Sequence, residues 1–182
     1  MPPMLSVVLI AVGSIPVVWV SRRSLLRPSS YGFYRFFAVE AILALLVLNA
    51  PKWFAHPFAA QQLASWLLLL TSVVTVISGS LTLRRLGRPQ PISHDSLDFY
   101  TTNLVTSGPY RYIRHPLYAS LLFLAWGAFL KTVSPLTIVL AVVGTASLIG
   151  TAKAEEVENA RHFGQAYRDY VARTRLFVPF VF

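Results

Sequence analysis

The chain has 182 residues, of which 55% are hydrophobic and 13% are charged, and its formal net charge is +9. A soluble domain usually carries about 25% charged residues, so this composition, with a mean hydropathy of +0.58, favours a membrane protein. The absence of Cys excludes disulfides, thiolate catalysis and cysteine metal sites, and the basic residues flank apolar runs instead of forming the continuous basic face typical of nucleic-acid binding.

Five apolar runs predict membrane spans, because a helix needs about 20 apolar residues to cross the hydrocarbon core. The runs are Met4–Val20, Phe36–Ala50, Leu63–Leu83, Tyr118–Leu130 and Pro135–Ala152. The second run reaches span length when Phe33 and Tyr34 are included. Arg22 and Arg23 follow the first run, which is the reverse of the charge order in a signal peptide, so we expect a retained span.

The fourth run is short, and Lys131-Thr132-Val133-Ser134 separates it from the fifth, which begins at Pro135. The two runs could form a tight helical hairpin whose first arm begins inside an Arg-His-Pro segment, or they could form one long kinked element. Because Lys131 and Pro135 make a turn at membrane depth unfavourable, we favour the hairpin.

The distribution of Lys and Arg predicts the orientation of the chain. Fourteen of the 16 basic residues lie before the second span, between the third and fourth, or after the fifth, and Lys52 and Lys131 lie in the other loops. The positive-inside rule then places the N-terminus outside and the C-terminus in the cytoplasm. We predict an all-α polytopic membrane protein with five transmembrane helices, the last two a hairpin, and a cytoplasmic C-terminal helix.

We expect one membrane domain over residues 1–182. Its predicted parts are three spans (1–83), a cytoplasmic connecting segment (84–117), the hairpin (118–152) and a cytoplasmic tail (153–182). The tail is rich in Ala, Glu, Gln and Arg up to Tyr170, which predicts a helix. Its end, Leu176–Phe182, is too short and too Pro-broken to span, so we expect it to pack back on the cytoplasmic face or to lie in the interface.

The segment Ser107–Tyr118 is the first candidate for chemistry. It is a Gly-Pro turn that leads through a basic, aromatic stretch into the membrane, and Pro116 suits the first position of a helix. The N–H groups and the positive dipole at such a helix end favour a carboxylate or a phosphate. The alternative is a set of topological charges and interface anchors.

Three carboxylates after the fifth run, Glu155, Glu156 and Glu158, are the second candidate. Two of them at a membrane face could hold a cationic ligand or a ribose, and one could act as a base. The alternative is a solvated helix start in which Glu158 pairs with Arg161 or His162 on the same helix face.

Isolated ionisable groups are weaker candidates. Glu40 lies within a span, where an ionisable residue indicates function, although a structural ion pair with Arg35 explains it equally well. The histidines lack metal-ligand spacing, so we expect no metal. They are His56, His94, His115 and His162.

Taken in order, these motifs form a larger pattern. It runs from Leu104-Val105-Thr106-Ser107-Gly108-x-Tyr110 through Arg114-His115-Pro116-x-Tyr118 and a hairpin to Glu155-Glu156, Phe163-Gly164, Tyr167, Tyr170, Arg173 and Pro179-Phe180. The pattern resembles the isoprenylcysteine carboxyl methyltransferase family and the related phospholipid methyltransferases. The resemblance covers about residues 102–182, and the first three spans match only in being hydrophobic.

The resemblance implies S-adenosylmethionine as methyl donor, bound at the cytoplasmic face beside a cleft open to the lipid bilayer, and a lipophilic methyl acceptor. The implied cofactor site consists of Thr102, Asn103, Leu104, Val105, Tyr110, His115, Pro116, Leu117, Tyr118 and Glu155. The catalytic candidates are Glu156, as a base for an amine or hydroxyl acceptor, and Arg173. The substrate candidates are Arg114 and Glu40.

Two departures leave the acceptor open between an isoprenylated carboxylate, a phospholipid amine and another small lipid. Thr151 stands where relatives that act on prenylated carboxylates tend to carry an Arg, and Thr102 stands where a His is common in the eukaryotic enzymes. The alternative functions are a membrane NADPH-dependent sterol-type reductase, which has a similar Arg-His segment, and a non-enzymatic membrane scaffold.

Overall fold

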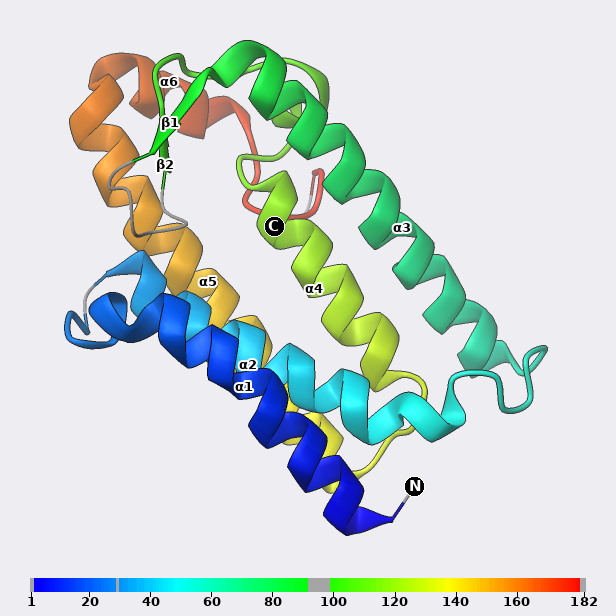
Figure 1. Cartoon of the computed structure of the whole chain (residues 1–182). Helices are drawn as coiled ribbons and strands as arrows, with labels where there is room; N and C mark the ends of the chain where they lie inside the picture. Colours follow the sequence, from blue (N-terminus) through cyan, green and yellow to red (C-terminus); the bar gives the residue numbers. More distant parts are fainter. Residues whose placement is uncertain (1, 29, 92–98, 181–182) are drawn as a thin grey trace.

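The computed structural model describes residues 2–28, 30–91 and 99–180, and this part of the chain forms six α-helices and a short β-hairpin (Figure 1). The helices are α1 (Pro3–Leu25), α2 (Tyr31–Asn49), α3 (Ala60–Thr82), α4 (Pro116–Phe129), α5 (Pro135–Phe163) and α6 (Gln165–Arg173). Strands β1 (Pro89–Pro91) and β2 (Phe99–Thr101) pair antiparallel, an element that the sequence did not predict. His94 lies outside the described residues.

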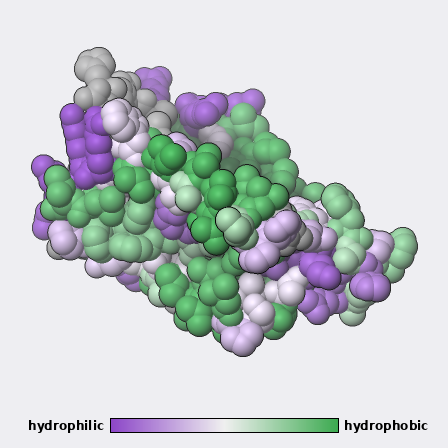
Figure 2. Space-filling view, turned by 60° about the horizontal axis from the view of Figure 1, so that its bottom comes forward, coloured by the Kyte–Doolittle hydropathy of each residue, from purple (hydrophilic) through white to green (hydrophobic). Residues whose placement is uncertain are grey.

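Four helices in the described part of the chain are long and apolar enough to cross a membrane, and they span Pro3–Leu25, Tyr31–Lys52, Ala60–Gly87 and Pro135–Phe163. Helix α4 is apolar but has 14 residues, which is shorter than the usual span length of about 17–25. Apolar side chains cover most of the middle of the face drawn in Figure 2, and hydrophilic ones gather towards its ends. The count of five spans and their orientation stay predictions.

The fourth and fifth apolar runs form two separate helices, α4 and α5, so the alternative of one long kinked element is wrong. Residues 130–134 form the turn between them. Ser134 starts α5 in a reciprocal capping box, in which its Oγ accepts from the N–H of Thr137 and its own N–H donates to Thr137 Oγ1. Pro135 occupies the first helical position, where a missing N–H has no cost.

The helices pack through small residues and interhelical hydrogen bonds, as membrane helices do. Between α3 and α4, the Oγ of Ser65 donates to the carbonyl of Gly127 at 2.7 Å, and a Cβ added at Gly127 would lie 2.9 Å from the side chain of Leu69. Helix α5 packs on α2 in the same way, since a Cβ at Gly150 would lie 2.9 Å from the ring of Tyr34. Helix α1 lies against α2 on the outside of the bundle (Figure 1).

The Arg-rich segments gather at one end of the bundle. The turn after α1, the β-hairpin, the segment before α4, and α6 all lie at this end, and the turns at 50–59 and 130–134 lie at the other (Figure 1). The segregation of charge along the sequence is therefore also a segregation in space. We call the end that contains the Arg-rich segments the arginine-rich end.

The segment 153–170, which the sequence predicts to be helical, is divided between two helices. Helix α5 continues without a break through residues 153–163, which we had assigned to the tail, and ends at Gly164, whose φ of 59° a glycine adopts readily. Helix α6 follows, and it continues beyond the predicted end at Tyr170 to Arg173. The chain then packs back on the helices, with Leu176 and Phe177 almost completely buried beside Ala38 and Leu148.

The returning tail also pairs with the segment before α4. The N–H of Arg114 donates to the carbonyl of Arg175 at 2.8 Å, and the N–H of His115 donates to that of Leu176 at 3.2 Å. The N–H of Arg175 donates in turn to the carbonyl of Tyr112 at 3.0 Å. These main-chain bonds fix the Arg-His-Pro segment just before it enters α4.

Candidate functional site

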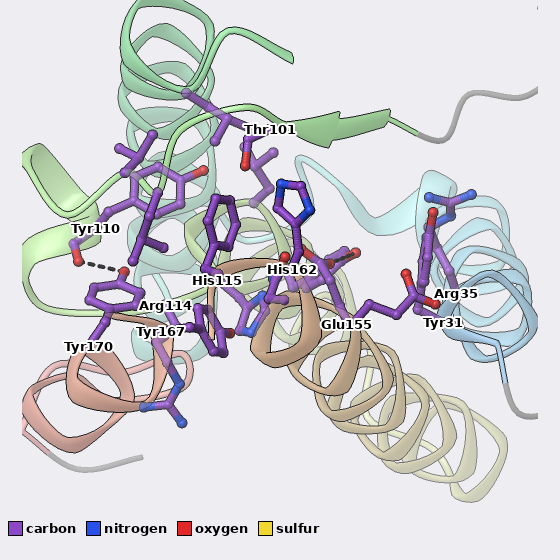
Figure 3. Close-up of a pocket in the computed structure, with 18 residues that line it drawn as sticks. Tyr31, Arg35, Thr101, Tyr110, Arg114, His115, Glu155, His162, Tyr167 and Tyr170 are labelled. Atoms are coloured by element: carbon purple, nitrogen blue, oxygen red, sulfur yellow. Dashed lines mark hydrogen bonds between the residues drawn. The ribbon is translucent and has the colours of Figure 1, made fainter. Parts of the chain in front are cut away.

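A cavity of about 440 Å³ opens at the arginine-rich end, between α2, the end of α3, the start of α4, the end of α5, and α6 (Figure 3). This volume lies within the range of about 300–1,000 Å³ that is usual for small-molecule sites. Its lining residues are Tyr31, Arg35, Leu83, Thr101, Leu104, Val105, Tyr110, Arg114, His115, Leu117, Tyr118, Glu155, Glu158, Asn159, His162, Phe163, Tyr167 and Tyr170.

The cavity brings together seven of the ten candidates for cofactor binding, although they are far apart in the sequence. These seven are Leu104, Val105, Tyr110, His115, Leu117, Tyr118 and Glu155, and the substrate candidate Arg114 lies beside them. Their assignment to a cofactor stays a prediction.

The other three cofactor candidates hold the backbone around the cavity and do not line it. The Oγ1 of Thr102 donates to the carbonyl of Arg88 at 2.7 Å, and the Nδ2 of Asn103 donates to that of Leu86 at 3.2 Å. Pro116 is buried at the start of α4 against Gly79 of α3, where an added Cβ would lie 3.1 Å from the Pro116 ring.

Glu155 is oriented in the cavity wall by a partner on another helix. The hydroxyl of Tyr118, in the first turn of α4, donates to Glu155 Oε2 at 2.5 Å. The ring of Tyr118 stacks on that of His115, with centroids 5.5 Å apart and 22° between the planes. His115 and Tyr118, at the start of α4, and Glu155 of α5 thus form one group of contacting side chains.

Arg114 makes several contacts that hold the fold together. Its Nε donates to Glu156 Oε1 at 2.5 Å, and one terminal nitrogen donates to the carbonyls of Thr174 at 2.5 Å and Val171 at 3.3 Å. The guanidinium therefore joins α5 to the end of α6 and to the tail. Only 8% of its side chain is exposed.

Glu156 lies in the polar last part of α5, beyond the apolar run, and does not line the cavity. Besides Arg114, it accepts from Lys153 Nζ at 2.9 Å, and the Nε2 of His115 lies 3.7 Å from Oε1. Burial raises the pKa of Glu156, but the polar contacts with His115, Lys153 and Arg114 outweigh burial, so the pKa lies below its usual value. A carboxylate stabilised in this way is a weak base.

A group of tyrosines forms the side of the cavity near α6. The hydroxyl of Tyr170 donates to the carbonyl of Tyr110 at 2.7 Å, which links α6 to the turn before α4 (Figure 3). Burial raises the pKa values of Tyr110, Tyr167 and Tyr170, and the nearby charges of Glu155 and Glu156 add to the effect at Tyr110 and Tyr167 respectively. These phenols stay neutral and offer ring faces and hydroxyl groups.

The remaining candidates lie away from the cavity. The side chain of Arg173 is exposed on α6, where its Nε donates to the carbonyl of Asp169 at 3.2 Å. Glu40 faces α1, and its Oε2 accepts from Ser14 Oγ at 2.6 Å. Thr151, one of the two departures noted in the sequence, is completely buried, and its hydroxyl donates to the carbonyl of Ser147 at 2.8 Å.

Five lining residues were missed by the sequence analysis, namely Tyr31 and Arg35 of α2, Leu83, Thr101 and Asn159. Arg35 had been counted among the topological charges, and no sequence motif marks it as part of a site. Among the described residues, no group of three or more His, Asp or Glu is placed to hold a metal ion.

A model of the phospholipid methyltransferase family matches residues 60–166 of the chain. The chain belongs to this family. The match covers more than half of the chain and contains the Arg-His-Pro segment and the acidic pair, which confirms the resemblance seen in the sequence. The family implies a membrane methyltransferase, and the match leaves α1 and α2 outside its limits. No curated protein matches the chain.

Proposed function

We propose that the chain is an S-adenosylmethionine-dependent methyltransferase, that the cavity at the arginine-rich end holds the cofactor, and that the acceptor is a lipophilic molecule. The observation that carries the proposal is Glu155, a carboxylate fixed by Tyr118 in the wall of a cavity lined by aromatic rings. Family membership supports methyl transfer over the reductase and scaffold alternatives.

The residues of the cavity suit the chemical groups of this cofactor. Its amine and sulfonium are cationic, and both carboxylates and ring faces attract cations. Glu155 and Glu158 supply the carboxylates, and Tyr110, Tyr167 and Phe163 supply aromatic rings to the same cavity. The apolar side chains of Leu104 and Val105 offer a surface for the adenine.

When bound, the cofactor would supply a methyl group on a sulfonium that is already an activated leaving group. The protein then needs mainly to align the acceptor and to exclude water. The buried rings of Tyr110, Tyr167 and Tyr170 exclude water on the side near α6, and the Tyr118–Glu155 contact keeps the opposite wall in place.

A carboxylate acceptor needs no base, whereas an amine or a hydroxyl does. The sequence pointed to Glu156 for this role, but its lowered pKa and its three polar neighbours favour a positioning role for Glu156 through Arg114. Glu155, Glu158 and His162 line the cavity and are the better candidates for a base that meets the acceptor.

The proposal is tested by isothermal titration calorimetry of S-adenosylmethionine binding to the detergent-solubilised protein. We expect saturable binding that falls at least tenfold in Glu155→Gln, because a hydrogen bond to a charged group is worth about 1.5–3 kcal/mol. Asp169→Asn removes an exposed carboxylate outside the cavity and is the matched control. Binding that survives in the double variant Glu155→Gln/His115→Ala contradicts this site, and a preference for NADPH favours the reductase.

A further inference from the structure

We propose that Tyr31 and Arg35 of α2 form an anion-binding subsite of the cavity, which takes a carboxylate or a phosphate of a bound ligand. The inference rests on the proposed function for the identity of the ligand. It assigns a role in binding to the N-terminal part of the chain, which lies outside the limits of the family match.

Both residues are part of the cavity wall. Tyr31 and Arg35 are one turn apart on α2, and the guanidinium lies 5.6 Å from the centroid of the Tyr31 ring. Figure 3 shows them on the side of the cavity opposite Tyr110 and Tyr170. A phenol and a guanidinium on one helix face provide hydrogen-bond donors to a single anionic group.

The packing of α2 on α5 fixes this pair at the level of Glu155. The two helices run antiparallel, because Tyr34 meets Gly150 and Ala41 meets Gly144. Continuing this register towards the start of α2 brings its first turn opposite the turn of α5 that contains Glu155. The subsite is therefore held by packed helices and does not depend on a loop.

A second arginine that lines the cavity, Arg114, lies on the side of the Arg-His-Pro segment. Arg114 donates to Glu156 and to the carbonyls of Thr174 and Val171. Arg35 is the lining cation on the opposite helix, and it faces a cavity that also contains the carboxylates of Glu155 and Glu158.

The charges in the cavity wall thus have both signs, which suits a ligand with both a cationic and an anionic group. The amino-acid part of S-adenosylmethionine has this character, and so does a phospholipid with an amine and a phosphate. Both sources share an anionic oxygen group, and the experiment must separate them.

The test compares three probes on detergent-solubilised protein by isothermal calorimetry. They are S-adenosylmethionine, its decarboxylated analogue, and dodecyl phosphate as a lipid-like anion. The variants are Arg35→Gln, Arg35→Lys and Tyr31→Phe, and Arg27→Gln is the matched control because it removes an exposed charge before α2, outside the cavity.

If the anion is the cofactor carboxylate, the wild-type protein prefers S-adenosylmethionine over its decarboxylated analogue by roughly tenfold or more, and Arg35→Gln abolishes the preference. If the anion belongs to the acceptor, the preference stays and the binding of dodecyl phosphate weakens by a similar factor. The effect of Arg35→Lys should be smaller than that of Arg35→Gln, because an ammonium keeps the charge but not the planar pair of donors. Tyr31→Phe should produce a smaller loss for the same probe.

The preference is a ratio of two affinities within one variant, so partial unfolding of that variant does not change it. Unchanged cofactor preference and unchanged dodecyl phosphate binding in Arg35→Gln overturn the subsite. Absence of any S-adenosylmethionine binding to the wild-type protein contradicts the proposed function instead, and the dodecyl phosphate titration still decides whether Arg35 binds an anion.

Discussion

A largely buried cation lies at each end of the described helical bundle, and the two are stabilised in different ways. At the arginine-rich end, Arg114 pairs with the carboxylate of Glu156. At the opposite end, Lys131 is 4% exposed, and its Nζ lies 3.6 Å from the centroid of the Trp66 ring. The same Nζ donates to Gln62 Oε1 at 3.0 Å and to the carbonyl of Trp53 at 3.3 Å.

The difference lies in what remains when the cation is removed. Loss of Arg114 leaves a partly buried carboxylate, whereas loss of Lys131 leaves aromatic rings and neutral polar groups, since no ion pair of Lys131 is found among the described residues. We therefore expect replacement of the cation to cost more stability where its partner is a carboxylate than where its partners are aromatic rings and neutral amides. Three predictions test this comparison.

The largest effect is expected for Arg114→Met. Removing one partner of a buried ion pair usually costs about 3–5 kcal/mol, and this change also removes the donors to Thr174 and Val171. Thermal unfolding in detergent, followed by circular dichroism, measures the loss. Arg161→Met removes an exposed arginine from α5 and serves as control. The double variant Arg114→Met/Glu156→Met should recover part of the stability, and a single variant as stable as the control would contradict the ion-pair account.

A smaller loss is expected for Lys131→Met. The methionine keeps the apolar contact with Trp66 but loses the cation–π interaction and the hydrogen bond to Gln62, which predicts a loss of about 1–2 kcal/mol. Lys52→Met, an exposed change in the neighbouring loop, is the matched control for the same unfolding measurement. A loss as large as that of Arg114→Met would show that the two ends do not differ as proposed.

The smallest effects are expected in the dependence of stability on pH. The pKa of Glu156 is lowered in the folded protein, so its contribution is fully present above the unfolded value of about 4.3 and is lost as pH falls through the folded value. Burial lowers the pKa of Lys131, so the unfolded chain binds more protons and stability rises with pH in the alkaline range between the folded and unfolded values.

Unfolding temperatures measured across both ranges should show the two effects separately. Glu156→Gln should flatten the acid part of the profile and leave the alkaline part unchanged, and Lys131→Met should do the opposite. An acid part that stays the same in Glu156→Gln would contradict the role given to the ion pair.

The hairpin of α4 and α5 could be predicted because its signals are local. Pro135 and the residues before it form the turn, and Ser134 caps α5 through Thr137 in the first turn of that helix. The residue at which α5 ends was harder to predict than the hairpin turn. Hydropathy falls at Lys153, but the helix continues to Phe163. Change of polarity marks the edge of an apolar run, not the end of a helix.

Within the candidate site, the sequence motifs located Glu155, His115 and Tyr118, but they did not distinguish residues that line the cavity from residues that support it. Thr102 and Asn103 belong to the same motif as Leu104, yet their side chains bond to backbone carbonyls outside the cavity lining. Which way a side chain points in an irregular segment depends on distant contacts, and these are not encoded in motif spacing.

The sequence by itself determined the apolar runs, the gathering of arginines in alternate loops, and the motif order that identified the family, because each of these depends on residue type and on spacing along the chain. The tertiary structure decided which helices pack together, and so placed Arg35 across the cavity from the tyrosines, Arg114 on Glu156, and Lys131 on Trp66. These pairings depend on the register of helices far apart in the sequence. Small residues such as Gly150 set that register through close contacts that only the folded chain makes.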